Sequence, residues 1–307
     1  MRLLPLIFAA TIITAPVLLH GQSYQDGVDA LLAEKPETAF EIFQPLAREG
    51  NVQAMTVLGT MYESGLGVTE DDTKAIMWYQ LAAEQGHYLA PFNLALMYAN
   101  GEGVPQDYAE AAKWYRMAAD QGHYLAAFNL ALMYANGEGV LQDYAEAAKW
   151  YRMAAELGNA AAQNNLAGMY YDGVGVPQDY AEAVKWYRMA ANQGDAWAQN
   201  NLGVMYDNGT GVPQNFSRAI RWYRLAAEQE NALAQYNLGV MYYDGKGVAQ
   251  NFTNAYILLN LAASQGYEAA REARDRAARV LTPDQLAEAQ RLSLEWEVGE
   301  PLPLQGG

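Results

Sequence analysis

A period of 36 residues restricts the fold of this 307-residue chain more than any other feature. Six segments align without insertion or deletion: 51–86, 87–122, 123–158, 159–194, 195–230 and 231–266. The second and third segments differ at only four positions, which indicates a tandem duplication. A repeat of this length is one supersecondary unit that cannot bury its apolar side alone. Neighbouring units are therefore expected to stack around one continuous core.

Each unit reads as a helix, a turn and a second helix. In the fourth unit, Ala162, Leu166 and Tyr170 recur at the spacing of one helical stripe. Glycines and a proline in segment 172–177 end that helix, because glycine tolerates left-handed backbone and proline stops helix continuation. Asp179 is then placed to cap a second helix. The sequence therefore predicts an all-α solenoid of six 36-residue helix–turn–helix repeats with helical caps.

The segments outside the repeats are expected to close the stack. Residues 22–50 predict N-terminal capping helices, and residues 267–297 predict C-terminal capping helices. The last of these opens with Thr282-Pro283-Asp284-Gln285, which supplies an N-cap, a proline at the first helical position and a glutamine at the third. Residues 298–307 are expected to form a disordered tail.

The first 21 residues have the layout of a secretory signal peptide. Arg2 gives a short positive region, residues 3–19 are apolar apart from two threonines, and a polar run begins at Gln22. The alternative is an uncleaved anchor helix, since a largely apolar segment of seventeen residues is at the lower limit for crossing a bilayer. The pattern predicts an exported protein, periplasmic or secreted, and no later segment is long and apolar enough to span a membrane.

Composition and charge limit the kinds of site and of binding partner that the chain can have. The absence of cysteine excludes disulfides, thiolate metal sites and a cysteine nucleophile. A net charge of −16 opposes binding to nucleic acid or to anionic lipid. A protein partner with a basic or extended segment fits this charge better, and the chain itself is expected to be a monomer or to self-associate weakly.

The repeats carry a recognisable residue pattern. The fourth unit contains Ala162, Asn165-Leu166, Met169-Tyr170, Gly173-Val174-Gly175-Val176, Asp179, Ala183, Trp186-Tyr187, Ala190-Ala191 and Gly194. This pattern resembles the Sel-one-like repeat family, relatives of the tetratricopeptide repeats. The resemblance covers all six units and implies right-handed αα-superhelical stacking with adaptor or scaffold roles, which in bacterial envelopes include secretion, signalling and host contact.

Two units depart from this pattern. Glu230 replaces the closing glycine of the fifth unit, so we expect another residue to adopt the turn backbone there. Leu258-Leu259 replaces Trp-Tyr in the sixth unit, where the layer meets the C-terminal cap.

A search for reactive groups gives little. His87 and His123 open neighbouring units, and we interpret them as exposed polar residues at helix starts, because no third ligand has a fixed spacing. The Gly-x-Gly turns lack the preceding strand and third glycine of a phosphate loop. No serine lies in a nucleophile motif. We therefore expect no catalytic residue, no metal site and no cofactor.

One polar column is a candidate binding surface. Asparagine recurs every 36 residues on the first helix, at Asn93, Asn129, Asn165, Asn201 and Asn237. An amide donates and accepts hydrogen bonds, as a peptide group does, so the column could hold an extended segment by its backbone. Peptide-binding tetratricopeptide arrays resemble this arrangement. The alternative is that each asparagine bonds to the adjoining helix and holds the stack.

Aromatic residues flank the column. The candidates for peptide contact are Phe92, Phe128, Tyr171, Trp197, Tyr236 and Tyr243. Aromatic side chains are enriched at interfaces, although part of this set is expected to be core.

The leading functional hypothesis is an exported adaptor that binds a protein or peptide segment in a concave groove and is not an enzyme. The alternatives are an envelope enzyme or enzyme regulator acting on peptidoglycan, polysaccharide or β-lactams, and a holder of broad specificity with a largely apolar groove. Catalysis would need a pocket with converging titratable groups.

Overall fold

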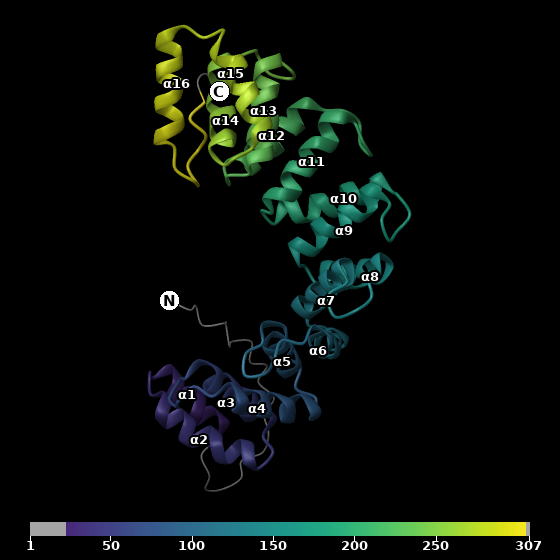
Figure 1. Cartoon of the computed structure of the whole chain (residues 1–307), viewed down its shortest axis with the longest axis vertical. Coiled ribbons are helices and arrows are strands. Elements are labelled where there is room, and N and C mark those ends of the chain that lie inside the picture. The colour runs from purple at the N-terminus through teal and green to yellow at the C-terminus, as the bar shows by residue number, and fades with distance from the viewer. Residues whose placement is uncertain (1–22, 305–307) are drawn as a thin grey trace. The chain divides into compact units, whose positions relative to one another are not determined.

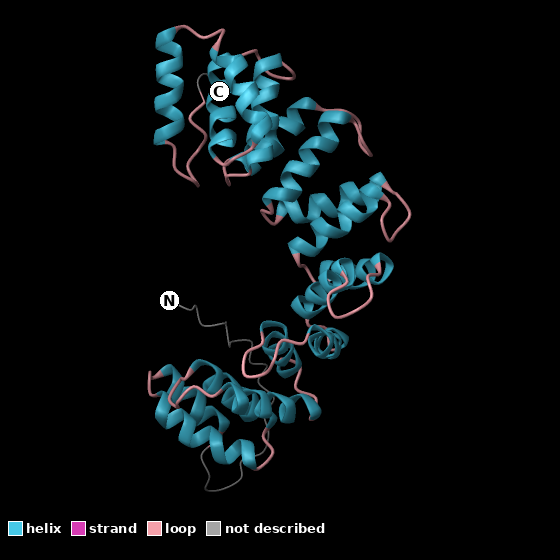
Figure 2. Ribbon diagram, viewed as in Figure 1, coloured by secondary structure: helices cyan, strands magenta, loops and turns pink. Residues whose placement is uncertain are grey.

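The fold is built entirely of helices in the part of the chain that the computed structural model describes, residues 23–304. These residues form sixteen α-helices and no strand. Figure 2 shows the helices joined by loops and turns. The chain divides into two compact units, Met1–Ala90 and Pro91–Gly307. The predicted signal segment, 1–21, lies outside the described residues.

The first unit contains four helices, each packed on the next. They are α1 (Tyr24–Leu32), α2 (Pro36–Arg48), α3 (Val52–Ser64) and α4 (Asp72–Glu84). Its core contains Phe43, Leu58 and Tyr79, all fully buried. Gly27 on α1 lets the ring of Phe43 approach closely, because a Cβ there would lie 2.6 Å from that ring. Residues 22–50 thus contribute two helices, α1 and α2, ahead of the first repeat.

The second unit continues the helix pairs (Figure 1). Its helices are α5 (Ala90–Asn100), α6 (Tyr108–Asp120), α7 (Tyr124–Asn136), α8 (Tyr144–Glu156), α9 (Ala160–Asp172), α10 (Tyr180–Asn192), α11 (Ala196–Asn208), α12 (Phe216–Ala227), α13 (Ala232–Asp244), α14 (Phe252–Ser264), α15 (Glu268–Ala278) and α16 (Pro283–Glu295). From α7 to α14, each first helix packs on the second helix of its own repeat and on that of the preceding repeat.

The repeat pattern fixes where the helices begin and end. In the fourth repeat, the Asn159 side chain accepts the N–H of Ala162 and caps α9. Gly173 ends α9 in left-handed backbone, and Asp179 caps α10 as the sequence predicts. These local signals recur in most repeats, which is why the repeat helices α3 to α14 have nearly equal lengths.

The second glycine of each turn controls the spacing between layers. Gly175 has φ +71°, and a Cβ on it would lie 2.2 Å from the carbonyl oxygen of Tyr144 in the preceding repeat. Gly139 and Gly211 make equivalent approaches one repeat before and one repeat after. Only glycine accepts both the left-handed backbone and the contact. The turn therefore joins two helices and also packs its repeat closely against the preceding repeat.

The expectation for the turn that closes the fifth repeat is wrong. No other residue takes over the turn backbone at Glu230, because Glu230 itself adopts it with φ +59°. The N–H of Asn231 still bonds to the carbonyl of Ala226 at 3.1 Å, as at the glycine-closed turns. The hydrogen bonds of the turn thus hold a non-glycine residue in left-handed backbone at a modest energetic cost.

The C-terminal helices pack against the last repeat. Both α15 and α16 contact α14, and Thr282 and Gln285 form the capping box that the sequence predicts. The segment after α16 has no helix but is held in place. Leu302 is 8% exposed within the core, and the Trp296 Nε1–H donates to the carbonyl of Glu300 at 3.2 Å. Part of segment 298–307, expected to be disordered, thus packs on the final helices.

Candidate functional site

The five column asparagines lie on the first helices of successive repeats, α5, α7, α9, α11 and α13. All five side chains are half-buried. They occupy the layer between the core and the solvent-facing side of the first helices, so both sequence interpretations of the column remain geometrically possible.

A chain of amide hydrogen bonds crosses the fourth to sixth repeats. The Asn237 Nδ2 donates to Asn200 Oδ1 at 3.0 Å, and the Asn201 Nδ2 donates to Asn164 Oδ1 at 3.2 Å. Within each helix, Asn200 donates to Asn201 at 3.3 Å and Asn164 donates to Asn165 at 3.4 Å. Five amides therefore form one ladder from α13 through α11 to α9.

The column also bonds to buried tyrosines of the preceding second helices. The pairs are Tyr115–Asn129, Tyr151–Asn165 and Tyr187–Asn201. Burial raises the pKa of each tyrosine hydroxyl, and the asparagine bond offsets only part of that rise. The hydroxyls therefore stay protonated at neutral pH and link each second helix to the next repeat. These are the contacts expected if the column holds the stack.

The predicted aromatic residues divide into two groups. Five are partly buried and pack on the core, and their ring contacts are Phe92–His123 at 4.2 Å, Phe128–Tyr151 at 5.8 Å, Tyr171–Tyr180 at 5.4 Å, Tyr236–Tyr267 at 5.1 Å and Tyr243–Phe252 at 5.3 Å. Trp197 differs, because it is 61% exposed near the start of α11. An exposed tryptophan is the strongest single marker of an interface on this face.

The neighbouring helix α9 lacks a side chain at one position of the first-helix face. Gly168 occupies the position held by Leu132 on α7 and by Val204 on α11. A Cβ added to Gly168 would meet only the Tyr187 hydroxyl, at 3.6 Å. The first-helix face therefore lacks a side chain at this point of α9, in the repeat that precedes Trp197. We call Trp197, Gly168 and the Asn165–Asn201 pair the first-helix site.

A second polar set was missed by the sequence reasoning. Gln163, Gln199 and Gln235 are buried and donate to backbone carbonyls of the preceding second helix at 2.9, 3.2 and 3.1 Å. Each also accepts from a glutamine that ends the second helix of its own repeat; the donors are Gln193, Gln229 and Gln265. Both glutamine sets recur every 36 residues, which was the available signal. Their partners show that they hold helices together.

The two histidines, expected to be exposed, are half-buried because each side chain packs into a structural contact. The His123 Nδ1 accepts the N–H of Ala126 at 3.2 Å and caps α7, and His87 bonds to the Thr56 hydroxyl at 2.9 Å. Burial lowers the pKa of both imidazoles. Across residues 23–304, no group of three or more His, Asp or Glu side chains is placed to hold a metal ion. In the same residues no helix is long and apolar enough to cross a bilayer.

Comparison with known proteins agrees with the repeat structure. The Sel1 repeat model matches residues 52–87, 90–123, 125–159, 160–195, 198–231 and 232–267. The crystal structure of c5321, a protective antigen of uropathogenic Escherichia coli strains, is 41% identical with a TM-score of 0.72. The alignment covers 83% of this chain and 56% of the antigen, so this chain spans little more than half of that protein's length.

A second solved structure matches nearly end to end. It is a Sel1 repeat protein from Oxalobacter formigenes, 35% identical with a TM-score of 0.65, and the alignment covers 79% of this chain and 97% of that protein. Comparison with the curated proteins found no match.

Proposed function

This chain belongs to the Sel1 repeat family, and from that premise we propose that it is a non-catalytic scaffold that binds an extended protein segment along its first helices. The observation that carries the proposal is the exposure of Trp197 on α11, next to a first helix, α9, that has no side chain at Gly168. An exposed tryptophan can become buried against an apolar side chain of a partner. The repetition of similar layers suits a partner in extended conformation.

The role of the asparagine column changes within this proposal. Asn201 donates to Asn164 of the preceding repeat, and Asn164 donates to Asn165, so both column residues help to order the first-helix surface. Their remaining lone pairs and N–H groups would be available to the segment. Replacing both by alanine should therefore lower the melting temperature as well as weaken binding. A column devoted to binding alone would leave melting unchanged.

Charge supports a basic segment as the partner. Asp172 and Asp244 are exposed at the ends of α9 and α13, and the chain carries a net charge of −16. Carboxylates at the ends of first helices attract lysine and arginine side chains at the rim of the site, where they raise the association rate more than the affinity.

Site-directed photo-crosslinking tests the proposal. Benzoylphenylalanine placed at Trp197 in the full chain, incubated with an envelope extract of the producing cell, should give a discrete protein adduct. The same label at Leu141, which is 91% exposed in a turn, is the control and should give none. Gly168→Leu inserts the residue that α7 carries at this position and should reduce the Trp197 adduct without lowering the melting temperature. Equal labelling from both positions would refute the proposed site.

We also propose that the chain is exported, from the pattern of residues 1–21 and not from the described structure. Intact mass of the protein isolated from a bacterial periplasm should correspond to a chain that starts near Gln22. A mass that retains Met1 would contradict cleavage. The protective antigen similar to this chain supports host contact as one setting for an exported scaffold.

The non-catalytic assignment is tested separately. Purified protein should not hydrolyse muropeptides or a chromogenic β-lactam above a buffer control. Hydrolysis that persists through successive purification steps would favour the envelope-enzyme alternative.

A further inference from the structure

Helix α12 differs in charge from the other second helices. Helices α6, α8 and α10 each place a glutamate near the start and a lysine three residues later, and these form the pairs Glu110–Lys113, Glu146–Lys149 and Glu182–Lys185. In α12 both positions are arginine, Arg218 and Arg221, and Arg224 follows. The helix carries these three arginines and no acidic residue between Phe216 and Ala227.

These arginines have no acidic partner. Within residues 23–304, Arg218, Arg221 and Arg224 form no salt bridge, and neither does Arg188 on α10. Their recorded partners are aromatic side chains. Arg188 and Arg218 donate to the Tyr206 hydroxyl at 2.9 and 3.2 Å, Arg224 donates to the Tyr242 hydroxyl at 3.2 Å, and Arg221 lies 6.0 Å from the Trp222 ring. We call these four arginines the α12 basic surface.

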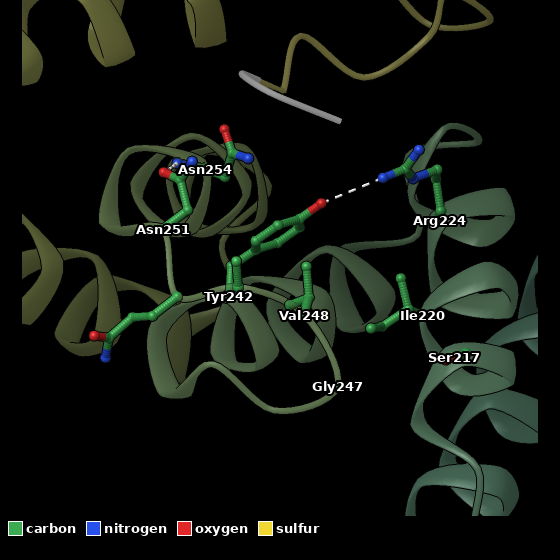
Figure 3. Close-up of a pocket in the computed structure, with 10 residues that line it drawn as sticks. Ser217, Ile220, Arg224, Tyr242, Gly247, Val248, Asn251 and Asn254 are labelled. Carbon is green, nitrogen blue, oxygen red and sulfur yellow. Dashed lines mark hydrogen bonds between the residues drawn. The ribbon is translucent and has the colours of Figure 1, made fainter.

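A cavity opens beside this surface. It has a volume of about 310 Å³ between α12, the turn before α14 and the start of α14. Figure 3 shows Arg224 and Ile220 extending from α12 toward Tyr242 and Val248. The Arg224 Nε–H is buried without a hydrogen-bond partner. The N-terminus of α14 adds a favourable electrostatic potential for anions at the same cavity.

We propose that the α12 basic surface and its cavity bind a short acidic segment of a partner protein. A glutamate or aspartate carboxylate in the cavity would accept from the Arg224 guanidinium, and its methylenes would lie against Ile220 and Val248. Further carboxylates along the segment pair with Arg218 and Arg221, which are exposed. This surface belongs to the second helices and is distinct from the first-helix site.

The net charge of the chain favours binding of a short acidic segment over binding of a larger anion. At physiological salt, charges interact over about 8 Å, so a short acidic peptide meets mainly the local arginines. An anionic bilayer or a nucleic acid meets a much larger part of a chain with net charge −16 and is repelled. A second copy of the chain carries the same net charge and is disfavoured for the same reason.

Fluorescence anisotropy of a labelled hexaglutamate peptide tests the proposal on the full chain. The test variant is Arg218→Glu with Arg221→Lys, which restores the glutamate–lysine pair of α10 and therefore preserves the fold. It should weaken peptide binding about tenfold, because two charge-assisted contacts are lost or reversed. The control is Arg276→Glu with Arg279→Lys, which makes the same two substitutions near the end of α15 and changes net charge equally.

Binding by the wild type and the control, with the α12 variant weakened and its melting unchanged, supports the proposal. Equal weakening in both variants would mean that only total charge matters and would overturn it. Failure of the peptide to bind, or tighter binding to phosphatidylglycerol vesicles than to the peptide, would also overturn it. The Gly168→Leu variant should bind hexaglutamate normally, so this outcome is independent of the first-helix site.

Discussion

Gly175 offers a direct measure of how strongly one repeat is seated on the next. In Gly175→Ala, the new Cβ would lie 2.2 Å from the Tyr144 carbonyl oxygen, so the turn must withdraw from α8 by about 1 Å to reach ordinary contact. Left-handed backbone costs alanine about 1 kcal/mol at φ +71°. Overpacking against a backbone atom that cannot rotate away adds about 1–3 kcal/mol. The variant should therefore lose about 2–4 kcal/mol of unfolding free energy.

Gly158→Ala separates the two contributions. Gly158 also has positive φ, +94°, but no atom lies within 4 Å of a Cβ built there. This control should lose only the backbone contribution, about 1 kcal/mol. Urea unfolding followed by far-ultraviolet circular dichroism gives the difference between the variants, provided that their m-values agree. Hydrogen exchange should show the loss concentrated at α8 and α10, because repeats interact mainly with their neighbours.

The result that would refute this reasoning is equal destabilisation of the two variants. That outcome would mean that the turn relaxes freely and that the glycine is needed only for its backbone conformation. Gly175→Ala indistinguishable from the wild type would contradict the backbone argument as well.

Three further outcomes follow from the helices themselves. Gly168→Ala should stabilise the chain by about 0.5–1 kcal/mol, because alanine has the higher helix propensity. Gly203→Ala should destabilise the chain, because the new Cβ would lie 2.7 Å from a buried tyrosine ring. Thermal melting of both variants checks these two outcomes. Asn200→Ala should cost about 1–3 kcal/mol, because it removes a fully buried side chain together with its hydrogen bonds to Asn201 and Asn237. Chemical denaturation measures this loss. Burial lowers the pKa of His123 below its unfolded value, so its contribution to stability is present above about pH 6.5 and is lost as the pH falls through the folded pKa. His123→Asn should flatten that part of a melting-temperature profile against pH, and an unchanged profile would contradict the assignment.

The helix pairs could be predicted because each of their boundaries rests on local chemistry repeated six times. Asp179 caps a helix and Gly173 ends one through bonds to residues within four positions, so the sequence alone contains both partners. Glu230 was predicted wrongly for a related reason. The local preference for glycine is real, but the hydrogen bonds of the packed turn outweigh a cost of about 1 kcal/mol.

The partners of the asparagine column could not be predicted from the period. Asn200 and Asn237 are 37 residues apart, one more than the repeat, so their contact depends on how far each layer is rotated against the next. Side-chain packing between helices sets that rotation, and the periodic pattern does not contain it. The sequence therefore places an asparagine on the correct face without showing whether its amide meets a partner protein or a neighbouring repeat.

The same distinction explains where binding surfaces should be sought in a repeat array. Residues that stacking requires must recur in every layer, because every layer solves the same packing problem. Trp197, Gly168 and the arginine pair Arg218 and Arg221 instead break the local pattern, and packing gives no reason for these departures, since neighbouring layers stack without them. The departures lie in the fourth and fifth repeats, one set on the first helices and one on a second helix. Two partners, one on each side of these layers, would account for both sets.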